Sequence, residues 1–241
     1  MGYPWIVDIK ALAEKYNLKY FVETGTLTGD TVDYVNSLGC FDKIFSVEIE
    51  PELYDLANKR FSSNDNVEIL LGNSYEVLET EILPQLDAPA FFWLDAHFPG
   101  ADIKLNGKKY TSETHVDTNC PLRRELDVIK KSPYHTSTFD GINGCSGQNV
   151  ILIDDAWIYT KQEVDGLFGV TKTIDQHMIN IGQPEASLKN MLGDEVSDSF
   201  IYNSFPNHQI GFITRSSGYF LITPFADIIN SNYDHMVSLQ R

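Results

Sequence analysis

The sequence has few cysteines, no long apolar run and no secretion signal, and each of these shortages excludes a class of protein. Its three cysteines, Cys40, Cys120 and Cys145, are too few and too irregularly spaced for a disulfide framework or a zinc cluster. No apolar run approaches the ~18 residues that a membrane helix needs. The N-terminus lacks the basic segment and following apolar segment of a secretion signal. We therefore expect a soluble cytoplasmic protein with no membrane partner.

Basic residues are also scarce, with 18 Lys and Arg against 34 Asp and Glu, for a formal net charge of −16. A surface of this charge repels a phosphate backbone, and the densest basic segments are only 104–109 and 130–131. We therefore expect no nucleic-acid partner. Since no linker, repeat or low-complexity segment divides the 241 residues, we expect a single domain, 1–241.

Apolar runs of strand length alternate with segments of helical periodicity along the chain. This alternation predicts an α/β fold with a mostly parallel sheet and an antiparallel hairpin near the C-terminus. The predicted strands are 20–22, 43–48, 67–71, 90–97, 149–155, 200–202, 209–214 and 218–223. The predicted helices are 6–16, 31–38, 52–60, 75–83, 121–131 and 171–181.

The segment 21–31, Phe-Val-Glu-Thr-Gly-Thr-Leu-Thr-Gly-Asp-Thr, predicts a strand, a tight loop and the start of a helix. Gly25 and Gly29 let backbone N–H groups approach a ligand beyond the end of the strand. Their G-x-x-x-G spacing is neither that of a dinucleotide fold nor that of a phosphate loop. Glu23, two residues before the first glycine, suits a cationic ligand better than a pyrophosphate. The alternative is an ordinary strand-to-helix turn.

Polar residues also follow the next two predicted strands. Glu48 ends the strand 43–48, about 20 residues beyond the glycine loop, where doubly wound folds hold a ribose diol. The strand 67–71 leads to Asn73 and Ser74. The alternative is that Glu48 is a solvated residue or a helix cap, and that Asn73 and Ser74 are ordinary helix caps.

Acids close the fourth and fifth strands. Asp95 and His97 end one strand and Asp154 and Asp155 end the other, so a doubly wound order brings the three carboxylates to adjacent strand ends. Such carboxylates repel one another without a cation, and their hard oxygen atoms suit Mg²⁺. His97 shares a side of its strand with Asp95. As alternatives, Asp154 and Asp155 cap the following helix and His97 is a packed, hydrogen-bonded residue.

The acid and glycine loop at 21–31 resembles the first motif of class I S-adenosylmethionine-dependent methyltransferases. Over most of its length the chain is similar to metal-dependent small-molecule O-methyltransferases, which include catechol and macrocin-type sugar enzymes. This resemblance implies a Rossmann-like seven-stranded sheet and methylation of a hydroxyl on a small molecule or sugar. It also implies Mg²⁺ or Mn²⁺ at Asp95, Asp154 and Asp155. The implied S-adenosylmethionine residues are Glu23, Thr24, Gly25, Thr26, Gly29, Asp30, Thr31, Glu48, Asn73, Ser74 and Asp95.

The chain departs from its relatives at the general base. Catechol enzymes carry a lysine three residues after the first metal-binding aspartate, and this chain has Phe98 there. His97 and Asp95 are then the two candidate catalytic bases, and an unperturbed histidine pKa near 6.5 suits that role. Enzymes that methylate nucleobases have D/N-P-P-F/Y at this strand end. The sequence Leu-Asp-Ala-His agrees with the absence of a nucleic-acid substrate.

Two irregular stretches interrupt the pattern. We expect 98–120 to be a lid over the acceptor, and 132–148 to be either a surface excursion or a contact with a second copy in a homo-oligomer.

Two rival functions stay open. One is a catalytically silent S-adenosylmethionine-binding partner protein. The other is a nucleotide-sugar or dinucleotide oxidoreductase, which would need a G-x-G-x-x-G loop that the sequence lacks.

Overall fold

A computed structural model describes residues 3–97, 121–135, 148–156, 199–205, 208–213, 218–224 and 236–238. The predicted lid at 98–120, most of the irregular stretch 132–148 and the predicted helix 171–181 lie outside these residues. The lid and the contact with a second copy therefore stay predictions. In the described part, no helix is both long and apolar enough to cross a membrane.

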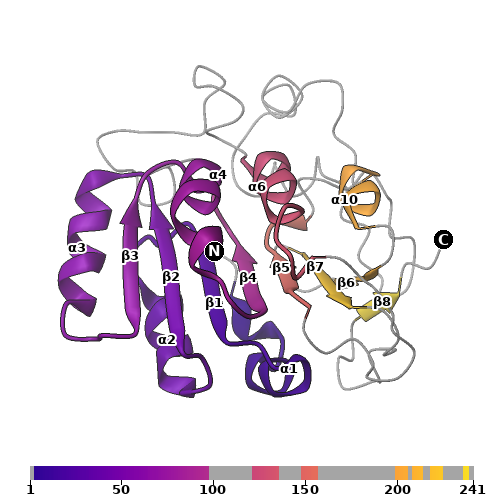
Figure 1. Cartoon of the computed structure of the whole chain (residues 1–241), viewed down its shortest axis with the longest axis horizontal. Helices are drawn as coiled ribbons and strands as arrows, with labels where there is room; N and C mark the ends of the chain where they lie inside the picture. The colour runs from indigo at the N-terminus through magenta and orange to yellow at the C-terminus, as the bar shows by residue number, and fades with distance from the viewer. Residues whose placement is uncertain are drawn as a thin grey trace.

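The strands form one sheet in the order β3-β2-β1-β4-β5-β7-β6-β8. Neighbours from β3 to β5 are parallel, and β7, β6 and β8 add antiparallel strands at one edge (Figure 1). The strands are Tyr20–Thr24 (β1), Lys43–Glu48 (β2), Val67–Leu71 (β3), Ala90–Leu94 (β4), Val150–Ile153 (β5), His208–Ile213 (β6), Tyr219–Pro224 (β7) and Met236–Ser238 (β8). The predicted Rossmann-like sheet is confirmed, and β8 extends it at the edge beyond β6.

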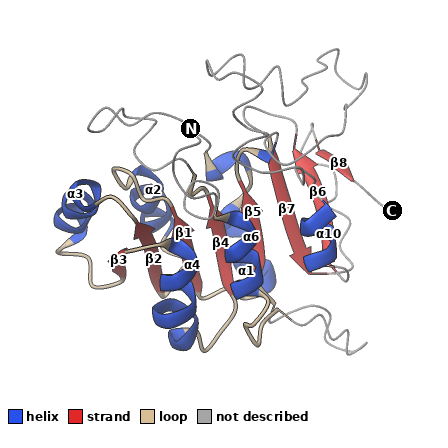
Figure 2. Ribbon diagram, turned by 90° about the horizontal axis from the view of Figure 1, so that it is seen from above, coloured by secondary structure: helices blue, strands red, loops and turns tan. Residues whose placement is uncertain are grey.

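Helices cover both faces of the sheet (Figure 2). Apolar side chains of α1, α2 and α3 pack on one face, and those of α4, α6 and α10 pack on the other. Their bounds are Ile9–Tyr16 (α1), Asp30–Leu38 (α2), Pro51–Phe61 (α3), Ser74–Val77 (α4), Leu122–Ile129 (α6) and Ser199–Ser204 (α10). The central strand β4 is buried along its whole length, as its unbroken apolar run predicts.

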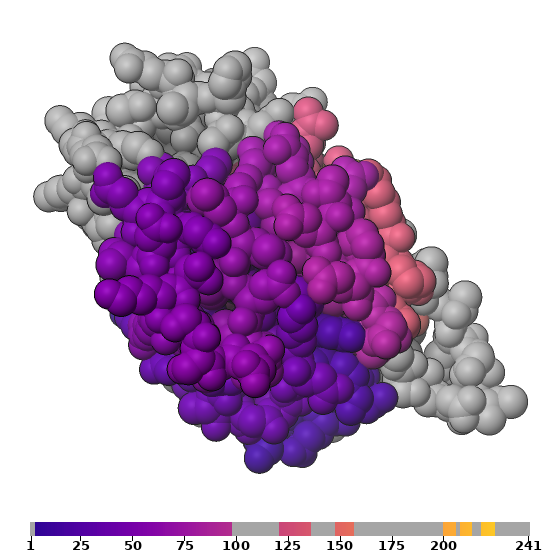
Figure 3. All heavy atoms as spheres, turned by 60° about the vertical axis from the view of Figure 1, so that its left-hand side comes forward, coloured from indigo at the N-terminus to yellow at the C-terminus, as the bar shows by residue number. Residues whose placement is uncertain are grey.

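In the space-filling view, residues up to 97 form one continuous packed surface, with 121–135 along its border (Figure 3). Two pairs of large aromatic side chains help to fill the interior. Phe21 stacks on Phe91 with ring centroids 5.6 Å apart, and Trp93 lies 6.1 Å from Tyr219. Phe21 and Phe91 come from the adjacent strands β1 and β4, and Trp93 and Tyr219 come from β4 and β7, which β5 separates. All four side chains belong to one core cluster, so they fix these strands relative to one another.

Three expectations about the elements need correction. Residues 200–202 belong to helix α10 and not to a strand, because a short apolar run does not distinguish the two. The helix predicted over 75–83 is divided into α4, a π-helical segment Leu78–Ile82 and a 3₁₀ turn Leu83–Gln85. The first helix begins at Ile9 and not at residue 6, because the Asp8 side chain caps it by accepting from the Ala11 N–H at 2.9 Å.

Candidate functional site

The loop between β1 and α2 depends on its two glycines. Gly25 (φ 89°) and Gly29 (φ 82°) both adopt left-handed conformations. A Cβ atom on Gly25 would lie 3.1 Å from the carbonyl oxygen of Asp95, so this loop runs closely against the loop after β4. A Cβ atom on Gly29 would lie 2.5 Å from Cε2 of Phe61. Gly25 therefore brings the first motif against the strand end that carries Asp95, and Gly29 lets the loop pack on α3.

Glu48 holds this loop from the end of β2. Its Oε2 atom accepts from the Leu27 N–H at 2.8 Å, and its Oε1 atom accepts from the Glu50 N–H at 2.9 Å. Leu27 has a φ of 53°, a left-handed conformation that the bond to Glu48 helps to maintain. Burial raises the pKa of Glu48, while these backbone bonds lower it. A carboxylate has about four acceptor positions, so Glu48 is still able to accept from a hydroxyl besides its backbone bonds.

Glu23 points to the opposite side of β1 from Thr24 and is almost fully buried. The Ser46 hydroxyl donates to Glu23 Oε2 at 2.5 Å and also lies 2.7 Å from Thr26 Oγ1. Burial raises the pKa of Glu23 to about 8, although hydrogen bonds from Ser46 and Thr31 lower it. Glu23 therefore ties the first motif to β2 and α2, and it holds a proton at neutral pH unless a cation approaches it.

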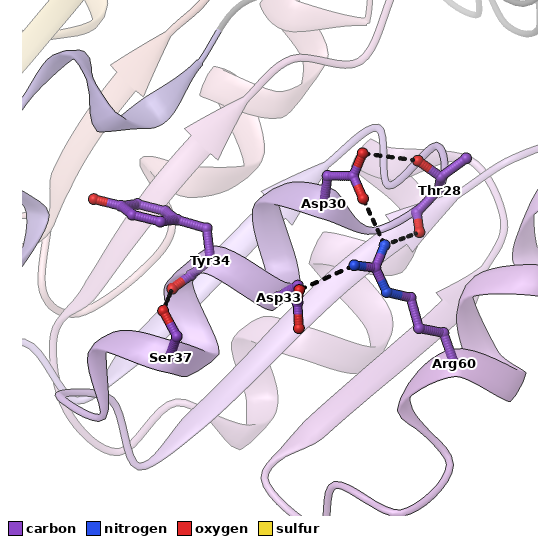
Figure 4. Close-up of polar contacts among 6 residues, drawn as sticks. All are labelled: Thr28, Asp30, Asp33, Tyr34, Ser37 and Arg60. Carbon is purple, nitrogen blue, oxygen red and sulfur yellow. Dashed lines mark hydrogen bonds and ion pairs between the residues drawn. The ribbon is translucent and has the colours of Figure 1, made fainter.

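An arginine that we did not predict fixes the outer side of the glycine loop (Figure 4). Arg60 of α3 donates to the Thr28 carbonyl oxygen at 2.8 Å and pairs with Asp30 at 2.6 Å and Asp33 at 3.0 Å. Asp30, a predicted cofactor residue, is thus an exposed partner of Arg60 on that side. The sequence gives no signal for this contact, because α3 and the loop are distant in the chain.

Asn73 and Ser74 follow β3, as predicted. The Gly72 N–H donates to the Glu48 carbonyl oxygen at 2.9 Å, which places the two strand ends together. Asn73 precedes α4 but its side chain makes no capping hydrogen bond, so the simple helix-cap alternative does not hold for it. Ser74, the first residue of α4, is buried. Both residues therefore lie at the carboxyl edge beside Glu48.

Among the residues that the structure describes, Asp95, His97 and Asp155 form a group that is able to hold a cation. One ligand atom from each lies within 4.8 Å of the others. His97 Nε2 is 2.7 Å from Asp155 Oδ2, and His97 Nδ1 is 3.7 Å from Asp95 Oδ1. Burial, and then the negative charges of Asp154 and Asp155, raise the pKa of Asp95 well above its usual range. A divalent cation would relieve this repulsion.

The structure combines these residues differently from the sequence prediction. Asp154 lies beside Asp95, where its charge and a side-chain hydrogen bond raise the pKa of Asp95, but it is outside the three-residue group. His97 takes the place that we expected for Asp154. Asp155 has a φ of 49°, a left-handed conformation that aspartate adopts more readily than most non-glycine residues. Asp154 remains anchored to β4 through its N–H, which donates to the Leu94 carbonyl oxygen at 3.0 Å.

The ring of His97 has a defined proton on one side. Nδ1 lies 2.8 Å from the Asp95 carbonyl oxygen, and because a carbonyl oxygen only accepts, Nδ1 carries the proton of that bond. The other nitrogen, Nε2, faces the Asp155 carboxylate. Without a cation, a bond there needs a proton on either His97 or Asp155. The ring is therefore held by both neighbours, in a suitable orientation to offer Nε2 as a ligand.

Comparison with solved structures identifies the fold that carries this site. The methyltransferase PaMTH1 from Podospora anserina, solved with SAH, aligns with a TM-score of 0.53 and 13% identity over 92% of this chain and 77% of that one. The O-methyltransferase TomG from Streptomyces achromogenes, solved with SAM, aligns with a TM-score of 0.52 and 13% identity. That alignment covers 94% of this chain and 82% of TomG. The chain has the class I methyltransferase fold. A scan of family models and a search of curated proteins gave no match.

In this fold the described residues suit an adenosyl cofactor in three respects. The backbone at Gly25 runs closely against the loop after β4, an acid stands at the end of β2, and buried polar atoms at this edge lack hydrogen-bond partners among the described residues. One of these atoms, Oε1 of Glu125 in α6, belongs to a residue that we did not predict. Glu125 is 1% exposed, and burial raises its pKa to about 7. Its position on the apolar stripe of Leu122, Leu126 and Ile129 is the signal that would have revealed it.

Proposed function

We propose that this chain is an S-adenosylmethionine-dependent O-methyltransferase that acts on a hydroxyl of a small molecule or sugar. The observation that carries the proposal is the convergence of the two motifs, since a Cβ atom on Gly25 would lie only 3.1 Å from the Asp95 carbonyl oxygen. A methyl donor held by the first motif would then lie beside the acidic strand ends. The fold shared with the SAH-bound and SAM-bound methyltransferases supports this assignment.

The cofactor side of the proposed site consists of residues from the ends of β1, β2 and β3. Glu48 accepts from the ribose hydroxyls with its remaining lone pairs, and Glu23 supplies negative charge close to a cationic cofactor. Backbone groups of the glycine loop approach the ligand closely. The further proposed members are Thr24, Thr26, Asp30, Thr31, Asn73 and Ser74, with Asp30 acting through its contact with Arg60.

The acceptor side is proposed to hold one divalent cation through Asp95, His97 and Asp155. Two carboxylates and one imidazole suit Mn²⁺, and the carboxylates also suit Mg²⁺. When bound, the cation would lower the pKa of an acceptor hydroxyl and fix its direction. Asp154 would orient Asp95 through their shared hydrogen bond. We therefore propose His97, in place of Asp154, as the third ligand beside Asp95 and Asp155.

The chain's own residues must also take the proton of the acceptor hydroxyl. The Nδ1–H of His97 is fixed on the Asp95 carbonyl oxygen, which favours His97 as a ligand and orienting residue. Asp95, whose pKa is raised by burial and by the neighbouring acids, is then the favoured base. On this assignment His97→Asn needs more Mn²⁺ but retains most of the turnover at saturating Mn²⁺, whereas Asp95→Asn loses turnover even there. The reverse result would make His97 the base.

Isothermal titration with S-adenosylmethionine and S-adenosylhomocysteine (SAH), with and without Mg²⁺, tests the proposal. We expect binding of both ligands, and methyl transfer to a hydroxyl acceptor that stops on chelation and resumes with added Mg²⁺ or Mn²⁺. If both ligands bind but no methyl transfer occurs, with or without added metal, a catalytically silent binding protein is favoured. Binding of a nicotinamide dinucleotide in their place would favour an oxidoreductase.

A further inference from the structure

Three buried polar side chains from three different elements lie together beside the proposed cofactor residues. Thr24 ends β1, Ser74 begins α4, and Glu125 comes from α6. Their exposed fractions are 0%, 6% and 1%. The hydroxyls of Ser74 and Thr24 approach Glu125 closely enough to lower its pKa, against the larger effect of burial. We refer to Thr24, Ser74 and Glu125 as the α6 cluster.

The hydrogen bonds within the α6 cluster are incomplete. Among the residues that the structure describes, Thr24 Oγ1, Ser74 Oγ and Glu125 Oε1 are all buried and make no hydrogen bond of ordinary geometry. A buried polar atom without a partner is costly, and almost all such atoms in native proteins are satisfied. A purely structural cross-link would have closed these bonds between the hydroxyls and the carboxylate. The two hydroxyls instead lie close enough to the Glu125 carboxylate to lower its pKa but outside ordinary hydrogen-bond geometry, so all three groups keep the capacity to bond a ligand group.

The position of the α6 cluster indicates which ligand it serves. Thr24 is followed directly by the glycine loop, and Ser74 directly follows Asn73, so both lie where the chain leaves the sheet at its carboxyl edge. This edge is where sheets of this type bind their ligands. Glu125 adds a negative charge or a strong acceptor, and S-adenosylmethionine carries both a sulfonium and an ammonium charge. The chemistry of the cluster thus complements a cationic, hydrogen-bond-donating ligand.

We propose that Glu125 is a further cofactor-binding residue, which acts with Thr24 and Ser74 to bind a hydrogen-bond-donating group of S-adenosylmethionine. This inference rests on the proposed function. Because the carboxylate only accepts when ionised, the group that it meets is an amino or hydroxyl group of the ligand. The two hydroxyls complete the cluster by accepting from or donating to that same group.

Isothermal titration with SAH tests the role of Glu125 without any need for an acceptor. Glu125→Met preserves the side-chain volume and removes an unpaired buried carboxyl, so we expect an unchanged or higher melting temperature. We expect its affinity for SAH to fall by about tenfold to a hundredfold, the effect of losing one hydrogen bond to a charged group. The control is Asp127→Ala on the same helix, where Asp127 is half exposed and pairs with Lys130. This control should bind SAH like the wild type.

A folded Glu125→Met protein with wild-type affinity for SAH would overturn the inference. Ser74→Ala provides the second variant if Glu125→Met does not fold. We expect Ser74→Ala to weaken SAH binding by about threefold to tenfold, and unchanged affinity would again contradict the inference. If the wild-type protein itself fails to bind SAH, the proposed function is wrong and this inference falls with it. Binding by the wild type and unaffected binding by the variants would overturn the inference alone.

Discussion

The two halves of the carboxyl edge are built in opposite ways. At the ends of β1 and β2, polar groups are bonded within the protein: Glu48 to two backbone N–H groups, Glu23 to Ser46, and Arg60 to the glycine loop. At the ends of β4 and β5, carboxylates lie against one another, and Asp95 Oδ1 is buried with no hydrogen-bond partner among the described residues. In the first half the acids and Arg60 thus have partners within the protein, and the Thr24 hydroxyl is the exception among the side chains named here, whereas the second half accumulates negative charge.

This difference indicates what each half needs. A loop that is fixed by its own contacts is preorganised, so a ligand that binds there does not have to order it. Repelling buried carboxylates gain from a divalent cation, because the cation replaces repulsion with attraction. We therefore expect changes in the first half to affect folding and cofactor affinity. Changes in the second half should affect the response to metal ions.

The largest expected effect comes from Gly29→Ala in the first half. The new Cβ atom would lie 2.5 Å from Phe61 and the φ of 82° is unfavourable, so we expect a loss of about 2–4 kcal/mol in the free energy of unfolding. Gly39→Ala is the matched control, because φ is also positive there but no atom lies within 4 Å of the new Cβ atom. It should cost only about 1–2 kcal/mol. Equal losses on urea denaturation would show that the contact with Phe61 is unimportant.

Glu48→Ala should weaken the binding of SAH by about 1–3 kcal/mol, because the ribose hydroxyls would lose a charged acceptor. The Leu27 N–H would also lose its acceptor, so thermal unfolding must be measured alongside the titration. Glu52→Ala, at an exposed acid in the first turn of α3, is the control. If the folded Glu48→Ala protein binds SAH as tightly as the wild type, Glu48 does not bind the ribose.

Glu23→Gln should change how stability depends on pH. The pKa of Glu23 is about 8 in the folded protein against a reference of 4.5, so the folded state retains a proton that the unfolded chain releases between these values. The contribution of Glu23 is therefore fully present below pH 4.5 and is lost as the pH rises through 8. We expect Glu23→Gln to be more stable than the wild type at pH 8 by roughly 1–2 kcal/mol and to show a smaller difference at pH 5. Parallel pH profiles would contradict the buried position of this acid.

Arg60→Met should have the smallest effect on stability, below about 1 kcal/mol, because its ion pairs with Asp30 and Asp33 are exposed to solvent. We also expect SAH affinity to fall about threefold, because the Thr28 carbonyl oxygen loses its partner and the glycine loop is less well fixed. Lys130→Met breaks an ion pair of similar exposure away from the loop. Equal SAH affinity in the two variants would show that Arg60 does not support cofactor binding through the glycine loop.

The sequence predicted the sheet and most of the strand ends because parallel strands are long apolar runs followed by polar loops. It did not predict that residues 200–202 form a helix, since a run of three apolar residues suits both structures. The sequence also did not predict that the expected helix 75–83 changes to a π-helical segment after Val77, because a π-helical turn hardly alters the hydrophobic periodicity.

The sequence predicted some residues of the candidate site but not others. Asp95 and Asp155 could be placed together because they end adjacent parallel strands. Strand alternation could not say which of Asp154 and His97 joins them, since both belong to irregular chain beyond the last paired residue. Arg60 gave no signal, because its role depends on a long-range contact. Glu125 did give one, as an acid within an apolar helical stripe, but helical periodicity alone does not say what faces it.

Manganese binding to the cofactor-free protein tests the contrast between the two halves most directly. Free Mn²⁺ would be followed by electron paramagnetic resonance in titrations of the wild type, Asp95→Asn and Glu48→Ala. We predict one site per chain in the wild type and in Glu48→Ala, and an affinity lower by about tenfold or more in Asp95→Asn, which loses a charged ligand. If Asp95→Asn binds Mn²⁺ as tightly as the wild type, the carboxylates at the ends of β4 and β5 are not a cation site.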